Sequence, residues 1–393
     1  MSDSLRILHV SPSFYPAWAY GGVPRCAYEL CRELVRLGHR VTVWTSDVFD
    51  RDSRLGSAAA VVDGIRVRRF RNLSNRLAHD YQLYLPLGVF AAARAHVADY
   101  DVVHVHSHRH LLQLAVSNAA RAAGVPYVLT GNGTVPAIER YIGIKQVLDS
   151  VGIAAIVRDS AACIAVSQAE VPHYTGVGVP PERVRVVPNG VRLAEFDRLP
   201  APESFRRIHA TGDGPLVAFV GKITPRKGVD VLIRAMAHLP GVRLVVAGNF
   251  MMSPAPIHAL VEELGLGDRV HFPGLLLGDE RNALYVDADV VAYPSIDEIF
   301  GLVAAEGIMC GSPVVVCGDS GCGELVQASG GGEVVPYGDP VALAAAIERL
   351  LADPAKRERH VRQGQAYIRD HLGWGAIAER TAEIYAEVIA ARK

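Results

Sequence analysis

Short apolar runs recur along the chain, separated by segments in which apolar residues return every three or four positions. This alternation is typical of α/β folds, in which amphipathic helices join buried parallel strands. One such helix is predicted over Val23–Leu37, where three leucines share a face and Gly38 follows as a C-cap. The strands predicted in the first half are Arg6–Val10, Val41–Thr45, Ile65–Arg69, Val102–His106, Tyr127–Thr130, Ala162–Val166 and Val184–Val187.

A second series of strands begins after Leu193–Pro215, which has three prolines, two glycines and no strong apolar period and is therefore predicted to be a linker. The tail Trp374–Ala391 has a helical period and could dock on either half. The chain is thus predicted to be an α/β protein with two Rossmann-like domains of similar size. The later strands are predicted at Leu216–Gly221, Arg243–Ala247, Val270–Phe272, Val290–Tyr293 and Pro313–Cys317.

Composition excludes several classes of protein. The 40 Lys+Arg and 41 Asp+Glu give a formal net charge of −1, so no global field draws the chain to nucleic acid and any anion site is local. The six cysteines form no C-x-x-C pair, which favours reduced thiols and a cytoplasmic location. We expect no signal peptide, because no basic segment precedes a long apolar one, and no transmembrane helix, because no apolar stretch approaches ~18 residues.

Two adjacent glycines, Gly21 and Gly22, follow the first predicted strand and precede a predicted helix. Ligands of parallel sheets bind at the carboxyl ends of the strands, where helix N-termini expose backbone N–H groups. Adjacent glycines would let the backbone approach a phosphate closely. A plain turn before a helix has the same pattern, so both interpretations stay open.

Four histidines, His104, His106, His108 and His110, occupy alternate positions in and after one predicted strand. Two alternate residues on one strand face can share a metal ion. No Cys or Glu follows at ligand spacing, so we interpret the row as the polar lining of a cleft and predict no metal site.

Asn132 lies between two glycines in the loop after Tyr127–Thr130. Its amide either donates to a substrate hydroxyl or merely lets the chain adopt a left-handed turn. The sequence does not separate these two roles.

A cationic segment runs from Gly221 to Gly228 and contains Lys222, Arg226 and Lys227. It follows a predicted strand and precedes a predicted helix, Val229–Leu239, so flexible ammonium groups and helix N–H donors would suit a diphosphate. A solvated run of charges is the alternative. Only five of the 40 basic residues are lysines, and two of them lie here, which favours the binding role.

The most informative stretch is Tyr293–Pro313. Gly301 is predicted to turn the chain into a short helix, Leu302–Cys310, whose N-terminal N–H groups would face a ligand. One turn into this helix, Glu306 can accept hydrogen bonds from two vicinal ribose hydroxyls. Glu298 lies before the helix, where ordinary capping also places carboxylates.

Two further features flank this stretch. A second glycine loop, Gly318–Glu324, follows the next predicted strand, and capping alone does not explain its recurrence. Asp287-Ala-Asp289 looks like the D-x-D pair that chelates Mg²⁺ or Mn²⁺ in another class of nucleotide-sugar enzymes. It precedes its strand, at the wrong end for the cleft, so we interpret it as a structural turn and predict no metal dependence.

In this order, the motifs resemble the retaining glycosyltransferases of family four, which have the GT-B fold, and the resemblance covers nearly the whole chain. Its most specific part is the context PSxxExFGLxxxEgxxxGxPVV around Glu298 and Glu306. The other motifs are Gly21-Gly22, His104–His108, Ala165-Val-Ser167-x-x-Glu170, Val186-Val-Pro188-Asn189-Gly190-Val, Gly221-Lys222, Lys227-Gly228, Gly311-x-Pro313-Val and Glu324. Arg71-Asn-Leu-Ser-Asn-Arg and Tyr81-Gln-Leu-Tyr are similar to members that build bacterial surface polysaccharides.

The resemblance implies two domains that face each other across a cleft. Residues 1–195 would form the acceptor-binding domain, joined by a returning helix over 373–393, and residues 196–372 would bind the nucleotide-sugar donor. The resemblance implies that the donor diphosphate is bound by Gly21, Gly22, Lys222 and Lys227. It implies that Glu306 binds the ribose, and that the donor sugar is bound by Glu298, Phe300, Gly301 and Leu302. His106 and His108 would line the acceptor site or cleft, and Lys222, Lys227, Glu298 and Asn132 form the predicted catalytic group.

The chain departs from the family pattern at two positions. Members usually have arginine at the position of Lys222, and an ammonium keeps the charge but loses the bidentate fork. They usually have a histidine that touches the donor sugar where this chain has Asn132, and an amide can donate a hydrogen bond but cannot take a charge.

The predicted function is that of a metal-independent, retaining glycosyltransferase of the hexosyltransferase type. It would move a sugar from a nucleoside diphosphate sugar, with UDP or GDP as the nucleotide, to a glycan or lipid-linked acceptor in cell-surface polysaccharide or glycolipid biosynthesis, without a cofactor. The alternative, motivated by Asn132, is a nucleotide-sugar-binding protein or a degenerate transferase without turnover. A basic run, Arg66, Arg68, Arg69, Arg71 and Arg76, either meets an anionic inner-membrane face or belongs to a solvated edge strand.

Overall fold

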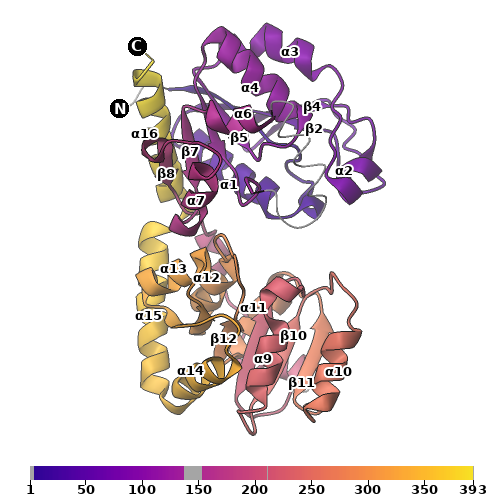
Figure 1. Cartoon of the computed structure of the whole chain (residues 1–393), viewed down its shortest axis with the longest axis vertical. Coiled ribbons are helices and arrows are strands. Elements are labelled where there is room, and N and C mark those ends of the chain that lie inside the picture. Colours follow the sequence, from indigo (N-terminus) through magenta and orange to yellow (C-terminus); the bar gives the residue numbers. More distant parts are fainter. Residues whose placement is uncertain (1–3, 137–152, 210, 393) are drawn as a thin grey trace. The chain divides into compact units, whose positions relative to one another are not determined.

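The computed structural model describes residues 4–136, 153–209 and 211–392. The chain divides into two compact units; in Figure 1 the first runs from indigo to magenta and includes the yellow C-terminal helix, and the second runs from magenta to yellow. The first unit comprises residues 1–190 and 374–393, and the second comprises residues 191–373. In the described ranges, each unit is built on one sheet, of eight and six strands respectively, with helices on its faces. The predicted α/β class with two parallel-sheet domains is confirmed.

The boundary between the units lies at Gly190 and Val191, whereas the sequence predicted residue 195. Val191 donates its N–H to the carbonyl of Leu372 at 2.6 Å and forms a parallel bridge with Gly373. This backbone pairing holds Val191 within the second unit. Because it is a long-range contact, the composition of the linker did not reveal it.

The first sheet has the strand order β3-β4-β2-β1-β5-β6-β7-β8, in which the β3–β4 pair is antiparallel and the pairs from β4 to β8 are parallel. Its strands are β1 (Arg6–Val10), β2 (Arg40–Ser46), β3 (Ala59–Val62), β4 (Ile65–Phe70), β5 (Val102–His106), β6 (Tyr127–Thr130), β7 (Ala162–Ala165) and β8 (Val184–Val186). The helices of this unit are α1 (Gly22–Arg36), α2 (Asn75–Tyr81), α3 (Val89–His96), α4 (Leu111–Ala123), α6 (Ala154–Arg158), α7 (Val171–Thr175) and α16 (Trp374–Ala390).

Strand β4 carries most of the basic run. One of the two sequence interpretations placed this run on an edge strand, but β4 does not lie at the edge of the sheet. The unpredicted β3 pairs with it and takes the edge position. Arg66 and Arg68 are exposed, but Arg69 is buried and donates to the carbonyl of Ser57 at 3.3 Å. The short β3 was missed although its residues are apolar, because they are exposed or half-buried and form a strand only through pairing with β4.

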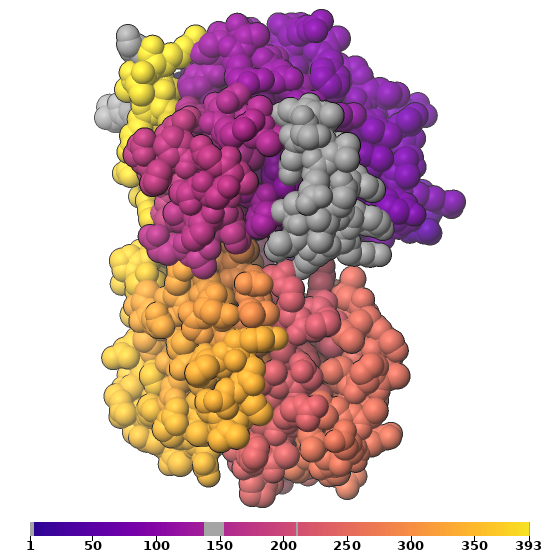
Figure 2. All heavy atoms as spheres, viewed as in Figure 1, coloured from indigo at the N-terminus to yellow at the C-terminus, as the bar shows by residue number. Residues whose placement is uncertain are grey.

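The C-terminal helix α16 docks on the first unit, as the resemblance implied. Trp374, Ile377 and Tyr385 are buried in the same core as Leu34 of α1. In Figure 2 the yellow C-terminal residues lie against the purple and magenta surface of this unit. The apolar face of α16 is therefore part of the core of the first sheet.

The second sheet is parallel throughout its described pairs and has the order β11-β10-β9-β12-β13-β14. Its strands are β9 (Leu216–Val220), β10 (Arg243–Ala247), β11 (Val270–Gly274), β12 (Val290–Tyr293), β13 (Val314–Cys317) and β14 (Gly332–Val335). Its helices are α8 (Ser204–His209), α9 (Val229–Met236), α10 (Ala255–Glu263), α11 (Gly278–Asp287), α12 (Leu302–Met309), α13 (Gly321–Ser329), α14 (Pro340–Ala352) and α15 (Pro354–His371). Among the described residues, no helix combines the length and the apolarity needed to cross a bilayer.

The segment predicted to be a linker instead contains the helix α8, which packs against α11 with Phe205 fully buried. Asp287 holds the start of this helix, because its carboxylate accepts from the N–H groups of Glu203, Phe205 and Arg206 at 2.6, 2.9 and 3.0 Å. Asp289 accepts from the N–H of Leu216 at 2.9 Å. Both carboxylates of the D-x-D pair thus bind backbone, which is the structural use expected from the sequence.

Replacing Asp287 by alanine is expected to lower the free energy of unfolding by about 2–4 kcal/mol, because three backbone N–H groups lose their acceptor. Urea unfolding followed by circular dichroism measures this loss. Replacement of the exposed Asp268 by alanine is the control and should change stability by less than about 0.5 kcal/mol. Equal stabilities of the two variants would contradict the capping role of Asp287.

Candidate active site

Three loops of the second unit meet at the carboxyl ends of the neighbouring strands β9, β12 and β13. The loop after β9 ends in the turn Pro225–Lys227, and the loop after β12 carries Glu298. The carbonyl of Glu298 accepts from the N–H of Gly321 at 2.7 Å, which ties the loop after β12 to the start of α13. The adjacency of the strands therefore brings together segments that are about a hundred residues apart in the sequence.

Lys227 and Glu298 form an ion pair in this corner, with side chains that are 22% and 19% exposed. Glu298 also accepts from the hydroxyls of Tyr293 at 2.9 Å and Ser295 at 3.4 Å. The Lys227 ammonium lies 5.1 Å from the centre of the Tyr293 ring, within cation–π range. Burial, and then the charge of Glu298, raise the pKa of the Tyr293 hydroxyl well above its usual value, so it stays a donor at neutral pH. Glu298 is thereby fixed in one orientation.

Two glycines of this corner fill positions that no other residue would fit. Gly228 has φ +65°, and a Cβ there would lie 2.2 Å from the carbonyl oxygen of Pro294. Gly301 has φ +70°, and a Cβ there would lie 2.7 Å from the sulfur of Cys322. Gly301 is the N-cap residue of α12, which begins at Leu302, while the side chain of Phe300 is buried. Gly301 is buried as well, and Leu302 is half-buried.

Glu306, one turn into α12, is held by two side chains of α11. Arg281 donates to one carboxylate oxygen at 3.1 Å and the Tyr285 hydroxyl donates to the other at 3.2 Å. We did not predict these two partners, although they are four residues apart and so share a helix face. Lys222 is exposed in the loop directly after β9.

In the first unit, Gly21 and Gly22 form the beginning of α1. Gly21 has φ +99°, which explains a glycine at this position, and a Cβ on either residue would meet nothing within 4 Å. The start of α1 is thus open toward the surrounding space within this unit.

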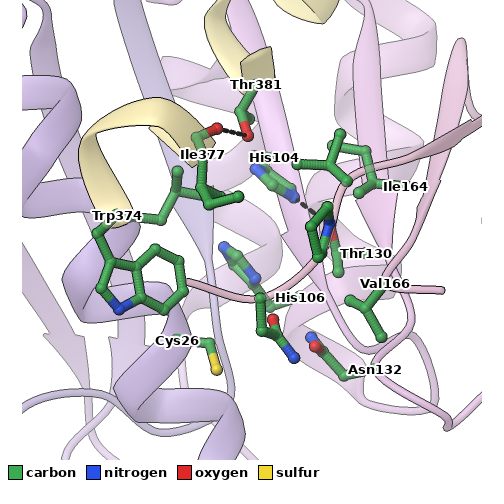
Figure 3. A pocket seen from close by; sticks show the side chains of 14 residues that line it. Cys26, His104, His106, Thr130, Asn132, Ile164, Val166, Trp374, Ile377 and Thr381 are labelled. Carbon is green, nitrogen blue, oxygen red and sulfur yellow. Dashed lines mark hydrogen bonds between the residues drawn. The ribbon is translucent and has the colours of Figure 1, made fainter. Parts of the chain in front are cut away.

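Asn132 adopts the left-handed conformation, with φ +51°. It lines a cavity of about 30 Å³, close to the volume of one water molecule, together with His106, Thr130 and Trp374 (Figure 3). Asn132 Nδ2 and His106 Nδ1 are buried and have no hydrogen-bond partner among the described residues. The structure therefore brings together two of the predicted residues, each with one polar atom that has no partner among the described residues.

His108 is not among the described residues that line this small cavity, and its predicted place in the acceptor site or cleft stays a prediction. It is buried, and its Nδ1 lies 3.4 Å from the hydroxyl of Thr134. The His110 ring contacts the Tyr84 ring edge to face, with 5.0 Å between the ring centres. Strand β5 ends at His106, so the alternation of side chains along a strand does not set the directions in which His108 and His110 point.

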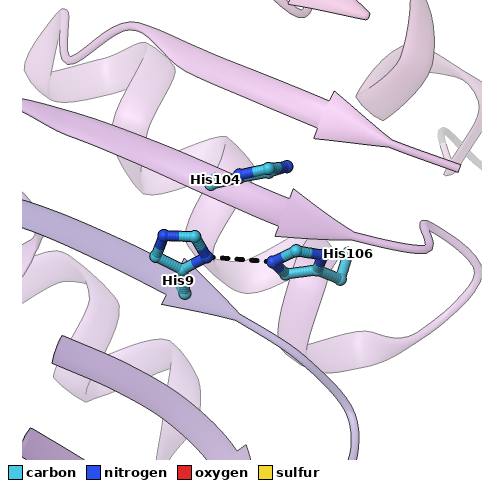
Figure 4. A group of neighbouring side chains, drawn as sticks. All are labelled: His9, His104 and His106. Carbon is cyan, nitrogen blue, oxygen red and sulfur yellow. Dashed lines mark hydrogen bonds between the residues drawn. The ribbon is translucent and has the colours of Figure 1, made fainter. Parts of the chain in front are cut away.

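His9, which the sequence analysis missed, joins His104 and His106 because β1 pairs with β5 and places His9 opposite His104 (Figure 4). His9 Nδ1 and His106 Nε2 share a hydrogen bond of 2.9 Å. His104 bonds the Tyr385 hydroxyl at 2.6 Å and the Thr130 hydroxyl at 2.8 Å. Burial lowers the pKa of His106 to about 3 and the pKa values of His9 and His104 well below the usual value. All three rings are therefore neutral at pH 7.

Ring nitrogens of these three histidines lie within 4.8 Å of one another, and imidazoles are ligands that zinc accepts. The ring of His104, however, stacks on that of His106 at 4.3 Å and 23° between planes. Its nitrogens point to Tyr385 and Thr130, and His9 Nδ1 and His106 Nε2 point to each other. The arrangement is a hydrogen-bonded network rather than a set of converging metal ligands.

Comparisons with known proteins agree with the fold. Residues 20–195 match the family model described as Glycosyltransferase Family 4, and residues 201–367 match Glycosyl transferases group 1. The chain is 33% identical to a D-inositol 3-phosphate glycosyltransferase of Xylanimonas cellulosilytica, over 97% of this chain and 95% of that protein. It is 30% identical to an uncharacterized glycosyltransferase of Methanocaldococcus jannaschii, over 94% and 95%.

Among solved structures, the Anabaena protein Alr3699/HepE in complex with UDP and glucose is similar with a TM-score of 0.74. The two chains are 22% identical, and the match covers 98% of this chain and 100% of that one. At this identity the likeness shows the fold, which is GT-B.

Proposed function

The chain belongs to glycosyltransferase family 4 and is a glycosyltransferase, and from this premise we propose that it transfers a sugar with retention from a nucleoside diphosphate sugar to an acceptor hydroxyl. The observation that carries the proposal is the corner of Lys227, Glu298 and Tyr293 beside the start of α12. A cation and a helix N-terminus suit a diphosphate, and a fixed carboxylate suits sugar hydroxyls.

In the proposed reaction, the acceptor oxygen bonds to the anomeric carbon on the face from which the diphosphate oxygen leaves. The acceptor proton passes to that leaving oxygen, so no protein nucleophile takes part. Lys222, Lys227 and the helix N–H groups stabilise the charge that develops on the diphosphate. Catalysis then rests on positioning and electrostatics, and the proposal includes no metal and no cofactor.

The remaining site residues receive roles in binding. Glu306, already oriented by Arg281 and Tyr285, would accept from the ribose hydroxyls, and Glu298 with the backbone from 300 to 302 would hold the donor sugar. Gly21 and Gly22 would approach the diphosphate. Asn132 would donate Nδ2 to a sugar hydroxyl, which its buried and unpartnered state supports.

Biologically, we propose a role in the synthesis of cell-surface polysaccharide or glycolipid, on a glycan or lipid-linked acceptor, at the cytoplasmic face of the membrane. The exposed Arg66 and Arg68, with exposed Tyr81 and Phe90 in the same unit, would meet anionic lipid. Arg69 and Arg76 contribute little, because Arg69 is buried and Arg76 pairs with Asp52. Co-sedimentation with anionic liposomes that weakens with salt would support this contact, and no co-sedimentation would contradict it.

The test of the function is transfer and hydrolysis with a panel of UDP-, GDP- and ADP-sugars. UDP donors come first because the similar Anabaena structure holds UDP, and D-inositol 3-phosphate joins the acceptors because a relative is named for it. Turnover with one donor is expected. No turnover together with a nucleotide-induced thermal shift would instead identify a binding protein or degenerate transferase. The absence of both turnover and a thermal shift would refute the proposal.

Asn132→His is the matched variant for this panel. It restores the usual family residue in a loop position that histidine also tolerates at positive φ. Activity that appears only in this variant would mark the natural chain as degenerate. Turnover by the natural chain would show that the Asn132 amide is sufficient for transfer.

A further inference from the structure

The loop after β6 is held on both sides of Asn132. The N–H of Gly131 donates to the Tyr174 hydroxyl at 2.8 Å. The N–H of Gly133 donates to a carboxylate oxygen of Glu170 at 2.6 Å. The N–H groups of the two glycines that flank Asn132 therefore both donate to side chains of one neighbouring segment, residues 170–174.

The same two side chains are anchored at the end of β7. The Tyr174 hydroxyl donates to the carbonyl of Ile164 at 2.8 Å, and the second carboxylate oxygen of Glu170 accepts from the N–H of Val166 at 2.8 Å. Both residues are fully buried, at 0% exposure. Because β6 and β7 are paired neighbours, these four bonds tie the loop that carries Asn132 to the adjacent strand.

The loop conformation depends on this support. Asn132 at φ +51° is in the left-handed region, which costs energy for any residue with a Cβ. Gly131 approaches so closely that a Cβ would lie 2.8 Å from the Tyr174 hydroxyl. Hydrogen bonds on both sides of a strained residue select this conformation over relaxed ones.

The chemistry at position 170 requires a carboxylate. Its two oxygens accept one N–H each, from Gly133 and Val166. A glutamine could accept only one of them, because its NH₂ group would face the other donor. Burial raises the pKa of Glu170 and the two N–H donors lower it, so these hydrogen bonds offset part of the cost of burying the carboxylate.

We infer that Glu170 and Tyr174 are positioning residues of the transfer reaction, which fix the Asn132 amide in the cavity that it shares with His106. The inference rests on the proposed function, since it requires Asn132 to act in transfer. Neither residue touches the cavity itself among the described residues, so both act through the loop.

The test is a double-mutant cycle between Glu170→Gln and Asn132→Ala, on the full chain with its best donor and acceptor. Glu170→Gln should lower kcat at least about tenfold and change the donor KM by less than about twofold. In the Asn132→Ala background it should lower kcat no further, because the group that it positions is gone. Tyr174→Phe, a milder change, should behave in the same way.

Tyr127→Phe is the matched control, since its buried hydroxyl donates to the carbonyl of Ile156 at 2.8 Å in the same unit, away from the loop. It should leave kcat unchanged. Amide hydrogen exchange provides a readout besides activity: Glu170→Gln should speed exchange at Gly133, and Tyr174→Phe at Gly131, at least about tenfold, without a change in β5.

The outcomes distinguish a failure of the positioning role from a failure of the proposed function. Independent, multiplicative losses from Glu170→Gln and Asn132→Ala would overturn the positioning role while leaving the transferase intact. Unchanged exchange at Gly131 and Gly133 would do the same. Full activity of Asn132→Ala would overturn the role of Asn132, and absence of turnover by the natural chain would overturn the proposed function itself.

Discussion

Replacing Lys227 by methionine is expected to lower kcat/KM by about a hundredfold or more. Methionine keeps an apolar stem over the Tyr293 ring but removes the cation that faces Glu298. The loss has two sources: the diphosphate charge that develops in transfer is no longer stabilised, and a partly buried carboxylate is left without its cation. Steady-state kinetics with the best donor measures the effect.

Lys356→Met is the matched control for this variant. Lys356 forms an ion pair with Glu333 at 2.5 Å in the same unit, and its side chain is 30% exposed, against 22% for Lys227. Both variants remove one ammonium from a Lys–Glu pair, but Glu333 also pairs with Arg349 at 2.5 Å, so Lys356→Met should destabilise the fold no more than Lys227→Met does. Only Lys227→Met should lose activity. Equal activities of the two variants would show that Lys227 stabilises the fold and nothing else.

The first unit is expected to unfold in mild acid, between about pH 6.5 and 5. Its described residues include His9, His104, His106 and His108, which are buried, and the half-buried His110. Burial lowers the pKa to about 3 for His106 and to about 4 for His110, and well below the usual value for the other three. These rings stay neutral in the native state while the unfolded chain takes up protons.

The sign follows from proton linkage. Above the unfolded histidine pKa of about 6.5, neither state binds the protons and stability does not depend on these groups. Below it the unfolded state binds more protons, so the free energy of unfolding falls, by about 2 kcal/mol per histidine at pH 5. Five such groups approach the whole stability of a typical domain, ~5–15 kcal/mol. Glu170, whose pKa is raised by burial, acts in the opposite direction but is a single group.

Tryptophan fluorescence follows this unfolding selectively, because all three tryptophans, Trp18, Trp44 and Trp374, belong to the first unit. Urea unfolding at pH 7.5, 6 and 5 should show the free energy falling steeply below pH 6.5. His106→Gln should reduce that slope by about one proton, or ~1.4 kcal/mol per pH unit, whereas replacement of the exposed His79 by glutamine should not. A free energy independent of pH down to 5 would contradict the burial of these rings as neutral groups.

Much of the fold was readable because buried parallel strands consist of continuous apolar runs. The runs at Arg6–Val10, Val102–His106 and Val290–Tyr293 became β1, β5 and β12 with the predicted bounds. The strand β3 and the helix α8 were missed, because their stability comes from partners elsewhere in the chain: β4 pairs with β3, and Asp287 holds the start of α8.

By itself, the sequence determined the fold class and which loops carry charged and glycine-rich segments, since these follow from local period and spacing, and its motifs carried the resemblance to the family. Only the tertiary structure decided that Lys227 meets Glu298, that Arg281 and Tyr285 hold Glu306, and that Glu170 and Tyr174 hold the loop of Asn132. It also added His9 to His104 and His106. The physical reason is that hydrogen bonds and ion pairs join side chains across neighbouring strands, and strand order is set by packing of the whole sheet rather than by any local pattern.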